Sequence, residues 1–178
     1  MKKALVVFSL VLVIAVSIVA GTLAMYTTTI DTLAQGSVVA KEFILLEDGS
    51  DTFTNDVKIA PAETQNWQFA VKNFDGAKIT ETKMKLDVTI NLAAISGKNE
   101  IAPLTVTVKN SNGDTVAALD STHKTVTFQD EFPIAAAGQS KSYTVAVNWP
   151  SNNAVDYSYA GANFGSAVTV SVTGTQVA

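Results

Sequence analysis

Strict alternation of apolar and polar residues is the feature that most constrains how this chain can fold. In KMKLDVTINL, residues 83–92, every second side chain is apolar, from Met84 to Leu92, and the side chains between them are polar. A period of two places the apolar side chains on one face of an extended strand. This stretch therefore predicts a β-strand with one buried face.

The same alternation recurs along the chain. It is found in NWQFAVKNF (66–74), LTVTVKN (104–110), SYTVAVNW (142–149) and AVTVSVTG (167–174), and clusters rich in Gly, Asn, Asp and Pro separate these stretches. Each half-buried strand needs a second layer to cover its apolar face. We therefore expect an all-β fold over residues 36–178. It should be an antiparallel two-sheet sandwich, jelly-roll or immunoglobulin-like, whose first strand begins at Gly36.

A tight hairpin is predicted at SNGD, residues 111–114, which follows LTVTVKN and precedes the short apolar stretch TVAAL. An Asn-Gly pair supplies the two positive φ angles that a type I′ turn requires. We expect Asn112 and Gly113 to close this hairpin.

The N-terminus has the features of a secretory signal. Lys2 and Lys3 precede an uncharged apolar run from Ala4 to Met25, and small residues gather at the end of that run. A basic start, an apolar middle and a small-residue exit are what a cleaved signal requires. An apolar helix or signal segment therefore precedes the β domain.

The preferred cleavage site lies between Ala24 and Met25, which makes residues 1–24 the signal peptide; cleavage after Ala20 is the second choice. A retained transmembrane helix is the alternative, because the apolar run is long enough to span a bilayer. No basic stop-transfer cluster follows the run, which favours cleavage.

Charge and composition exclude several classes of function. All twelve basic residues are Lys. Outside the signal segment the chain has ten Lys and 16 Asp and Glu, which gives a formal charge of −6. Nucleic acids and anionic membranes bind clustered Lys and Arg, so we expect neither as a partner. The absence of Cys excludes disulfides and thiolate metal sites.

Residues suited to catalysis or ligand binding are few. His123 is the only histidine, no Gly-x-Ser-x-Gly motif is present, and we interpret His123 as a strand-start residue. The Asp-containing turns at 47–51 and 111–114 lack EF-hand spacing and are interpreted as solvated turns, with Ca²⁺ binding left open. Trp67 and Trp149 alternate with polar neighbours, which favours core packing over carbohydrate stacking. We expect no catalytic residue, metal site, cofactor or enzymatic activity.

Four short stretches form an ordered pattern along nearly the whole chain. GTLAMY (21–26) places small residues before an aromatic one, and LAQGSVV (33–39) has an apolar-x-x-Gly-x-apolar pattern. KIAPAETQNWQFAVKNFDG (58–76) contains a Pro, an acidic turn and an aromatic strand, and YAGANFGSAVTVSVTGTQ (159–176) ends the chain with Tyr-x-Gly and an alternating strand. Together these stretches resemble the TasA/camelysin family of exported bacterial proteins.

The chain departs from the family pattern in two places. It lacks the long Lys-rich insertion of the fibre-forming type member, and Thr and Ile replace the acidic residue that is usual soon after the cleavage junction. Camelysin-type members have been described as metalloproteases, but we find no ligand set here on which to carry that activity over.

The resemblance implies a secreted structural subunit. Family members leave the cell through a dedicated signal peptidase, and some assemble into biofilm-matrix fibres by donor-strand exchange. In that mechanism the mature N-terminal segment of one subunit completes a sheet of the next. The resemblance thus implies a head-to-tail homopolymer in the extracellular matrix or at the cell surface. Its other partners would be the signal peptidase and further matrix proteins.

Residues 25–35 suit the part of a donor segment. MYTTTIDTL is dense in β-branched and aromatic residues, which favour extended pairing, but its apolar pattern is too sparse to organise a sheet alone. On an exposed sheet edge it would gain a ladder of backbone hydrogen bonds. The contacts would come from Tyr26, Thr28, Ile30 and Leu33. A flexible spacer, or an ordinary first strand of the same subunit, is the alternative.

Two other functions stay open. A pilin- or archaellin-like filament subunit would keep its N-terminal apolar helix as the filament core, although no charged-residue-Gly processing site precedes the apolar run. A monomeric binding module or hydrolase of the cell surface is the third function considered.

Overall fold

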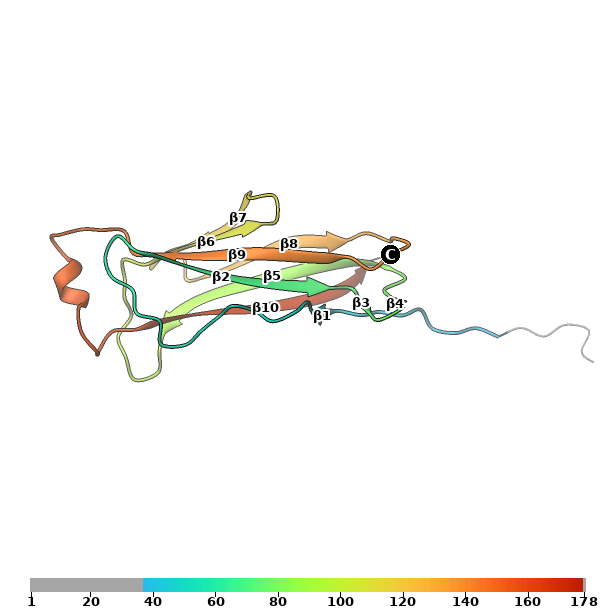
Figure 1. The fold of residues 1–178 in the computed structure, drawn as a ribbon, viewed down its shortest axis with the longest axis horizontal. Coiled ribbons are helices and arrows are strands. Elements are labelled where there is room, and N and C mark those ends of the chain that lie inside the picture. Colours follow the sequence, from blue (N-terminus) through green and yellow to red (C-terminus); the bar gives the residue numbers. More distant parts are fainter. Residues whose placement is uncertain (1–36, 178) are drawn as a thin grey trace, which may run out of the picture. The chain divides into compact units, whose positions relative to one another are not determined.

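The computed structural model describes residues 37–177, and the strands in this part of the chain form antiparallel sheets (Figure 1). The chain divides into two units, Met1–Val39 and Ala40–Ala178, and every described strand belongs to the second. The expected N-terminal helix and signal segment lie outside the described residues. The all-β, antiparallel fold class is confirmed for residues 37–177.

Two sheets contain the long strands. The larger has the order β1-β2-β9-β6-β7, with β1 (Leu46–Glu47), β2 (Thr64–Lys72), β9 (Ser140–Asn148), β6 (Thr105–Asn110) and β7 (Thr115–Leu119). The smaller has the order β10-β5-β8, with β10 (Ser166–Val177), β5 (Lys83–Ala94) and β8 (Thr125–Phe132). A separate small hairpin joins β3 (Phe74–Asp75) to β4 (Lys78–Ile79), and a 3-10 helix spans Asp156–Tyr159.

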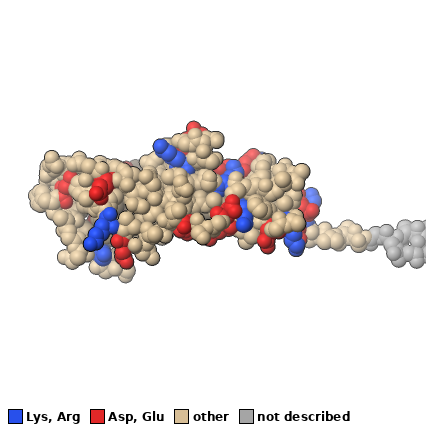
Figure 2. Space-filling view, in the orientation of Figure 1, with Lys and Arg blue, Asp and Glu red and all other residues tan. Residues whose placement is uncertain are grey.

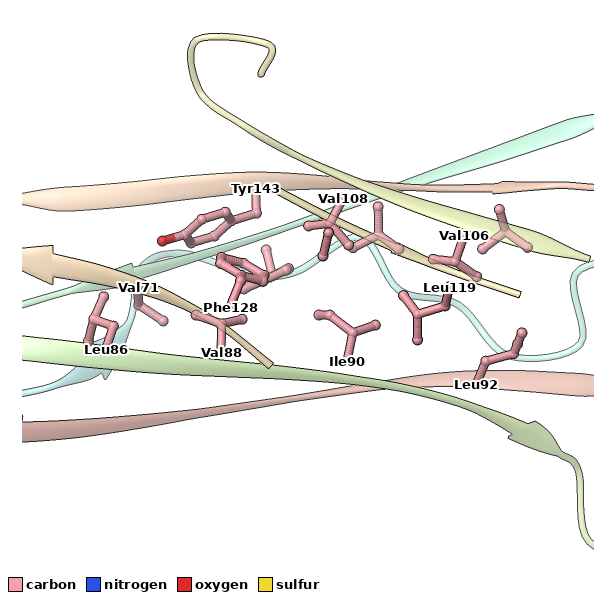
Figure 3. Packing of buried hydrophobic residues seen from close by; sticks show 14 of the residues in the cluster. Val71, Leu86, Val88, Ile90, Leu92, Val106, Val108, Leu119, Phe128 and Tyr143 are labelled. Carbon is pink, nitrogen blue, oxygen red and sulfur yellow. The ribbon is translucent and has the colours of Figure 1, made fainter. Parts of the chain in front are cut away.

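The alternation along β5 buries one of its faces completely. Its five inward side chains are at most 1% exposed: Met84, Leu86, Val88, Ile90 and Leu92. Figure 3 shows β5 side chains directed toward residues of the larger sheet, among them Val106, Val108 and Tyr143. Burial of one such side chain stabilises a fold by about 1.5 to 3 kcal/mol. One hydrophobic core shared by the two sheets therefore holds the domain together.

The five alternating stretches found in the sequence are confirmed as β2, β5, β6, β9 and β10. Strand β8 was not among them, because its inward position 130 is occupied by Asp, which interrupts the apolar alternation. Neither sequence period nor propensity marks such a carboxylate as inward-facing.

Asp130 links the two sheets through polar contacts. Its carboxylate accepts hydrogen bonds from the Tyr143 hydroxyl at 2.7 Å and from Lys141 Nζ at 2.8 Å, and both donors lie on β9 of the larger sheet. Partial burial would raise the pKa of Asp130, but the bonds from Lys141, Tyr143 and the Glu131 amide hold this pKa below its usual range. Burial, together with the neighbouring carboxylate, raises the pKa of Tyr143.

The β6–β7 hairpin is present, but its turn is not type I′. Gly113 has a φ of +86°, whereas Asn112 is not among the residues with positive φ. The Asn110 side chain accepts hydrogen bonds from the amides of Asn112 and Asp114, and Gly113 N–H donates to the Asn110 carbonyl. This pattern fits a three-residue loop, a type I turn followed by a left-handed glycine. Side-chain capping by Asn110 is what stabilises the longer loop.

The prediction of a first strand from Gly36 is wrong for residues 37–45, which form no strand; Gly36 itself lies outside the described residues. The Thr80 hydroxyl, in a residue only 2% exposed, accepts a hydrogen bond from Ile44 N–H at 2.8 Å and donates one to the Ile44 carbonyl at 2.9 Å. Glu81 N–H donates to the Glu42 carbonyl. The connection between β4 and β5 thus bonds to this backbone, which the sequence predicted to be a strand.

Replacing Asp130 with Asn should lower stability at neutral pH and weaken its acid dependence. A carboxyl whose folded pKa is lowered stabilises the fold above its unfolded pKa, and this stabilisation is lost as the pH falls through the folded value. We expect Asp130→Asn to cost about 1 to 2 kcal/mol at pH 7 and much less once the pH falls below the folded pKa of Asp130. Urea unfolding at several pH values measures the free energy of unfolding and its dependence on pH.

Asp87→Asn is the control, since it removes a carboxylate that pairs with Lys85 on the outer face of β5. This variant should change the unfolding free energy by less than about 0.5 kcal/mol. Equal acid dependence in the wild type and Asp130→Asn would contradict the assigned cross-sheet role.

Candidate functional site

The residues proposed from the sequence for cleavage and assembly lie outside the described part of the chain. They are Ala24, Met25, Tyr26, Thr28, Ile30 and Leu33. No helix within residues 37–177 is long and apolar enough to cross a membrane. Within the described range, a functional site must therefore be sought on the β domain.

His123 lies in an exposed turn two residues before β8. Asp120 shapes this turn, because one oxygen of its carboxylate accepts hydrogen bonds from the Thr122 hydroxyl and from the amides of Thr122 and His123. These bonds, from the Thr122 hydroxyl first, hold the pKa of Asp120 well below its usual range. The His123 side chain is 80% exposed. This geometry has the form of a capped turn.

The acidic turn after β1 uses its carboxylates to bind its own backbone. Glu47 accepts a hydrogen bond from Asp51 N–H at 3.1 Å, and Asp51 accepts one from Phe53 N–H at 2.8 Å. Among residues 37–177 no group of three or more His, Cys, Asp and Glu side chains could hold a metal ion.

Both tryptophans pack in or against the core, as predicted. Trp149 is 4% exposed, and its indole N–H donates a hydrogen bond to Asp156 at 3.1 Å. Trp67 is half-buried and stacks on Phe53, with 5.1 Å between ring centroids. Trp149 is thus buried, and the ring of Phe53 covers one face of the Trp67 indole.

The outer edge of β10 is the most unusual feature of the described residues. Its twelve residues pair with β5 on one side, and no other backbone of the described chain bonds to residues 167–177. Its sequence, SAVTVSVTGTQV, contains neither a charged residue nor a proline. Natural proteins protect edge strands with charges, prolines, bulges or short length, because a bare edge pairs with other chains.

The other edges in residues 37–177 carry such protection. Strand β8, at the opposite edge of the same sheet, contains Asp130 and Glu131, which form ion pairs with Lys141 and Lys83. Strand β7 has five residues and β1 only two. The bare edge of β10 is therefore an exception within its own domain.

The inward side chains of β10 are only partly covered. Val168, Val170 and Val172 pack against the core but stay half-buried, whereas their neighbours across the ladder on β5 are fully buried. Apolar side chains at a finished sheet edge would lie under the next strand. Within residues 37–177 the edge of β10 thus has no backbone partner, and its apolar face is only partly covered.

The chain that follows β1 runs beside β2. Asp48 N–H donates to the Ala70 carbonyl at 2.9 Å, and Thr52 N–H donates to the Gln68 carbonyl at 3.0 Å. The segment 48–53 therefore bonds to the free edge of β2, and no segment of residues 37–177 does the same for the edge of β10.

A cavity of about 270 Å³ lies where the edges of the two sheets face each other. Its walls come from β10, β2, β1 and the segment after β1: Glu47, Asp51, Phe53, Phe69, Ala70, Val71, Val170 and Val172. Six of the eight lining residues are apolar, but polar atoms contribute nearly as much of the cavity surface as apolar atoms do, and the two carboxylates, Glu47 and Asp51, are exposed. We name this cavity, together with the outer edge of β10, the open edge.

Charge does not gather in one continuous patch on the face seen in Figure 2. Lys side chains stand beside Asp and Glu side chains, and a broad uncharged stretch separates the charged groups. Over much of that face a partner would therefore meet uncharged residues.

Sequence reasoning identified the strand that forms the open edge but not its position in the sheet. The stretch 167–174 has the same alternation of apolar and polar residues as the other strands. Its position at the edge of the sheet depends on pairing with β5, which is far away in the sequence. The lack of charge and proline in β10 was the available signal. Comparisons with protein-family models, curated proteins and solved structures found no match to this chain.

Proposed function

We propose that this protein is a secreted structural subunit, without enzymatic activity, that polymerises into extracellular biofilm-matrix fibres by donor-strand exchange. The uncharged, proline-free edge of β10 is the observation that carries the proposal. Residues 25–35 of one copy would add a strand beside β10 of the next copy. A contact of this heterologous kind does not close on itself and therefore propagates a filament.

The strand topology supports a two-sheet sandwich of jelly-roll type. A jelly roll has eight strands in two sheets, with the first strand beside the last. Strands β2, β9, β6 and β7, four of the five strands in the larger sheet, match one complete four-stranded sheet, and β10, β5 and β8 match three strands of the other. Among residues 37–177 no strand takes the place of the first strand, beside β10. A donor strand would take that place.

The same topology argues against the immunoglobulin-like alternative. In an immunoglobulin fold the last strand pairs with the strand that precedes it in the chain. Here β10 pairs with β5, while β9 pairs with β2 and β6.

The donor segment brings the groups that the open edge lacks. A strand beside β10 would satisfy its outer backbone groups and cover Val168, Val170 and Val172. Pairing of this kind gains affinity from main-chain hydrogen bonds and specificity from alternate side chains. Export through a signal peptidase that cuts between Ala24 and Met25 would release the donor segment, so assembly would follow secretion.

Deletion of residues 25–35 from the mature protein should leave a folded monomer that forms no filaments. The deletion removes the donor and keeps the described strands and core. Circular dichroism checks the fold, and negative-stain electron microscopy checks for filaments at matched concentrations. Filaments of the deleted protein at the wild-type concentration would sink the donor-strand proposal.

Cysteine cross-linking should locate the acceptor edge, because the natural chain has no Cys. A copy carrying Thr29→Cys in the donor segment should cross-link, through a short bis-maleimide that adds to both thiols, to a copy carrying Ser171→Cys on β10. Thr127→Cys is the matched control, since Thr127 is exposed in the same cross-strand row as Ser171 but lies on β8. Equal cross-linking to both positions would contradict an acceptor edge at β10.

The N-terminal residue of the extracellular protein separates this proposal from the pilin-like alternative. Donor-strand exchange expects a mature chain that starts at Met25 or close to it. A pilin-like subunit would start near Lys3 or Ala4, and Edman degradation or intact mass spectrometry measures the start directly.

A further inference from the structure

We infer that the cavity of the open edge is the seat of one side chain, Tyr26 of a neighbouring copy, which would set the register of the added strand. This inference rests on the proposed function. It goes further by naming the residue that the cavity accepts and the groups that bind it.

The cavity has room for an aromatic ring. Its volume is about 270 Å³, and an apolar protein cavity of roughly 150 Å³ holds a benzene molecule. Phe53 and Phe69 stand on one side of it with 6.5 Å between their ring centroids, and Val170 and Val172 of β10 line the other side. Aromatic rings favour such offset or tilted neighbours at roughly 4.5 to 7 Å.

Two carboxylates give the cavity a polar side. One oxygen of Glu47 accepts from Asp51 N–H, and one oxygen of Asp51 accepts from Phe53 N–H. Within residues 37–177 the second oxygen of each carboxylate takes part in no hydrogen bond or ion pair. A group that fills this cavity should therefore be apolar along its length and should end in a hydrogen-bond donor.

Tyr26 is the residue of the donor segment that meets both requirements. A tyrosine has an apolar ring and a hydroxyl that donates to a carboxylate. Ile30 and Leu33 have no donor and would leave the carboxylates to be covered by apolar atoms, at a cost in free energy. In an extended strand Tyr26, Thr28 and Ile30 share one face, so seating Tyr26 directs Ile30 toward the same apolar side of β10.

The test measures binding of a synthetic peptide, residues 25–35, to the protein lacking residues 1–36. This shortened protein keeps every described strand and the whole core, and circular dichroism verifies its fold. We expect the peptide to bind. Tyr26→Ala should weaken binding about 30-fold or more, as for a buried aromatic anchor, and Tyr26→Phe about five-fold. Thr27→Ala, on the opposite face of the strand, should change affinity less than about two-fold.

A double-mutant cycle identifies the partners of the hydroxyl. Glu47→Gln with Asp51→Asn in the shortened protein should abolish most of the difference in affinity between the natural peptide and its Tyr26→Phe variant. Asp75→Asn, which changes an exposed carboxylate on β3, is the matched control and should leave this difference unchanged.

The outcomes separate the two proposals. A peptide that binds equally well with Tyr, Phe or Ala at position 26 would overturn the seat of Tyr26 and leave donor-strand assembly standing. A peptide that does not bind a folded shortened protein would overturn both.

Discussion

The complete burial of one face of β5 is the constraint on which the rest of the domain depends. This strand is the centre of the smaller sheet, and its inward residues, from Met84 to Leu92, form the floor of the shared core. Pairing with β5 on either side holds β8 and β10 in place. The two flanking strands then differ. Strand β8 carries ion pairs and the hydrogen bonds of Asp130, whereas the outer backbone of β10 has no partner among the described residues.

The two flanks of the smaller sheet also differ in how they meet the larger sheet. One ion pair, Lys141–Asp130, and the hydroxyl of the buried Tyr143 join β8 to the larger sheet. On the other side the segment 48–53 bonds to β2, and β10 is left with half-covered valines and a cavity. Among the described residues, the β8 flank is thus bonded to the larger sheet and the β10 flank is open. The proposed head-to-tail assembly requires two such different ends.

The sequence predicts the strands of this fold much better than their arrangement. Local alternation was enough to find β5 and β10, since the period of two is a property of neighbouring residues. It missed β8, where Asp130 takes an inward place that only a tyrosine and a lysine of another strand make acceptable. It also predicted a strand where the Thr80 hydroxyl binds the backbone of Ile44 instead.

The open edge itself needed the three-dimensional structure. Which strand stands at an edge depends on pairings between residues far apart in the chain, and no local pattern encodes them. The donor segment was proposed from the sequence on its β-branched composition, but the cavity at Glu47 and Phe53 was not foreseen. That cavity forms only when an irregular segment, β2 and β10 come together.

The ladder between β10 and β5 also has a mechanical consequence. Its twelve residue pairs are antiparallel, and the hydrogen bonds of such a ladder lie perpendicular to the strands. A force applied along β10 therefore loads these bonds together in shear, whereas a force across the strand would break them one after another. All the hydrogen bonds of the ladder would therefore resist tension along β10 together. Strand β5, on the other side of this ladder, carries the buried centre of the hydrophobic core.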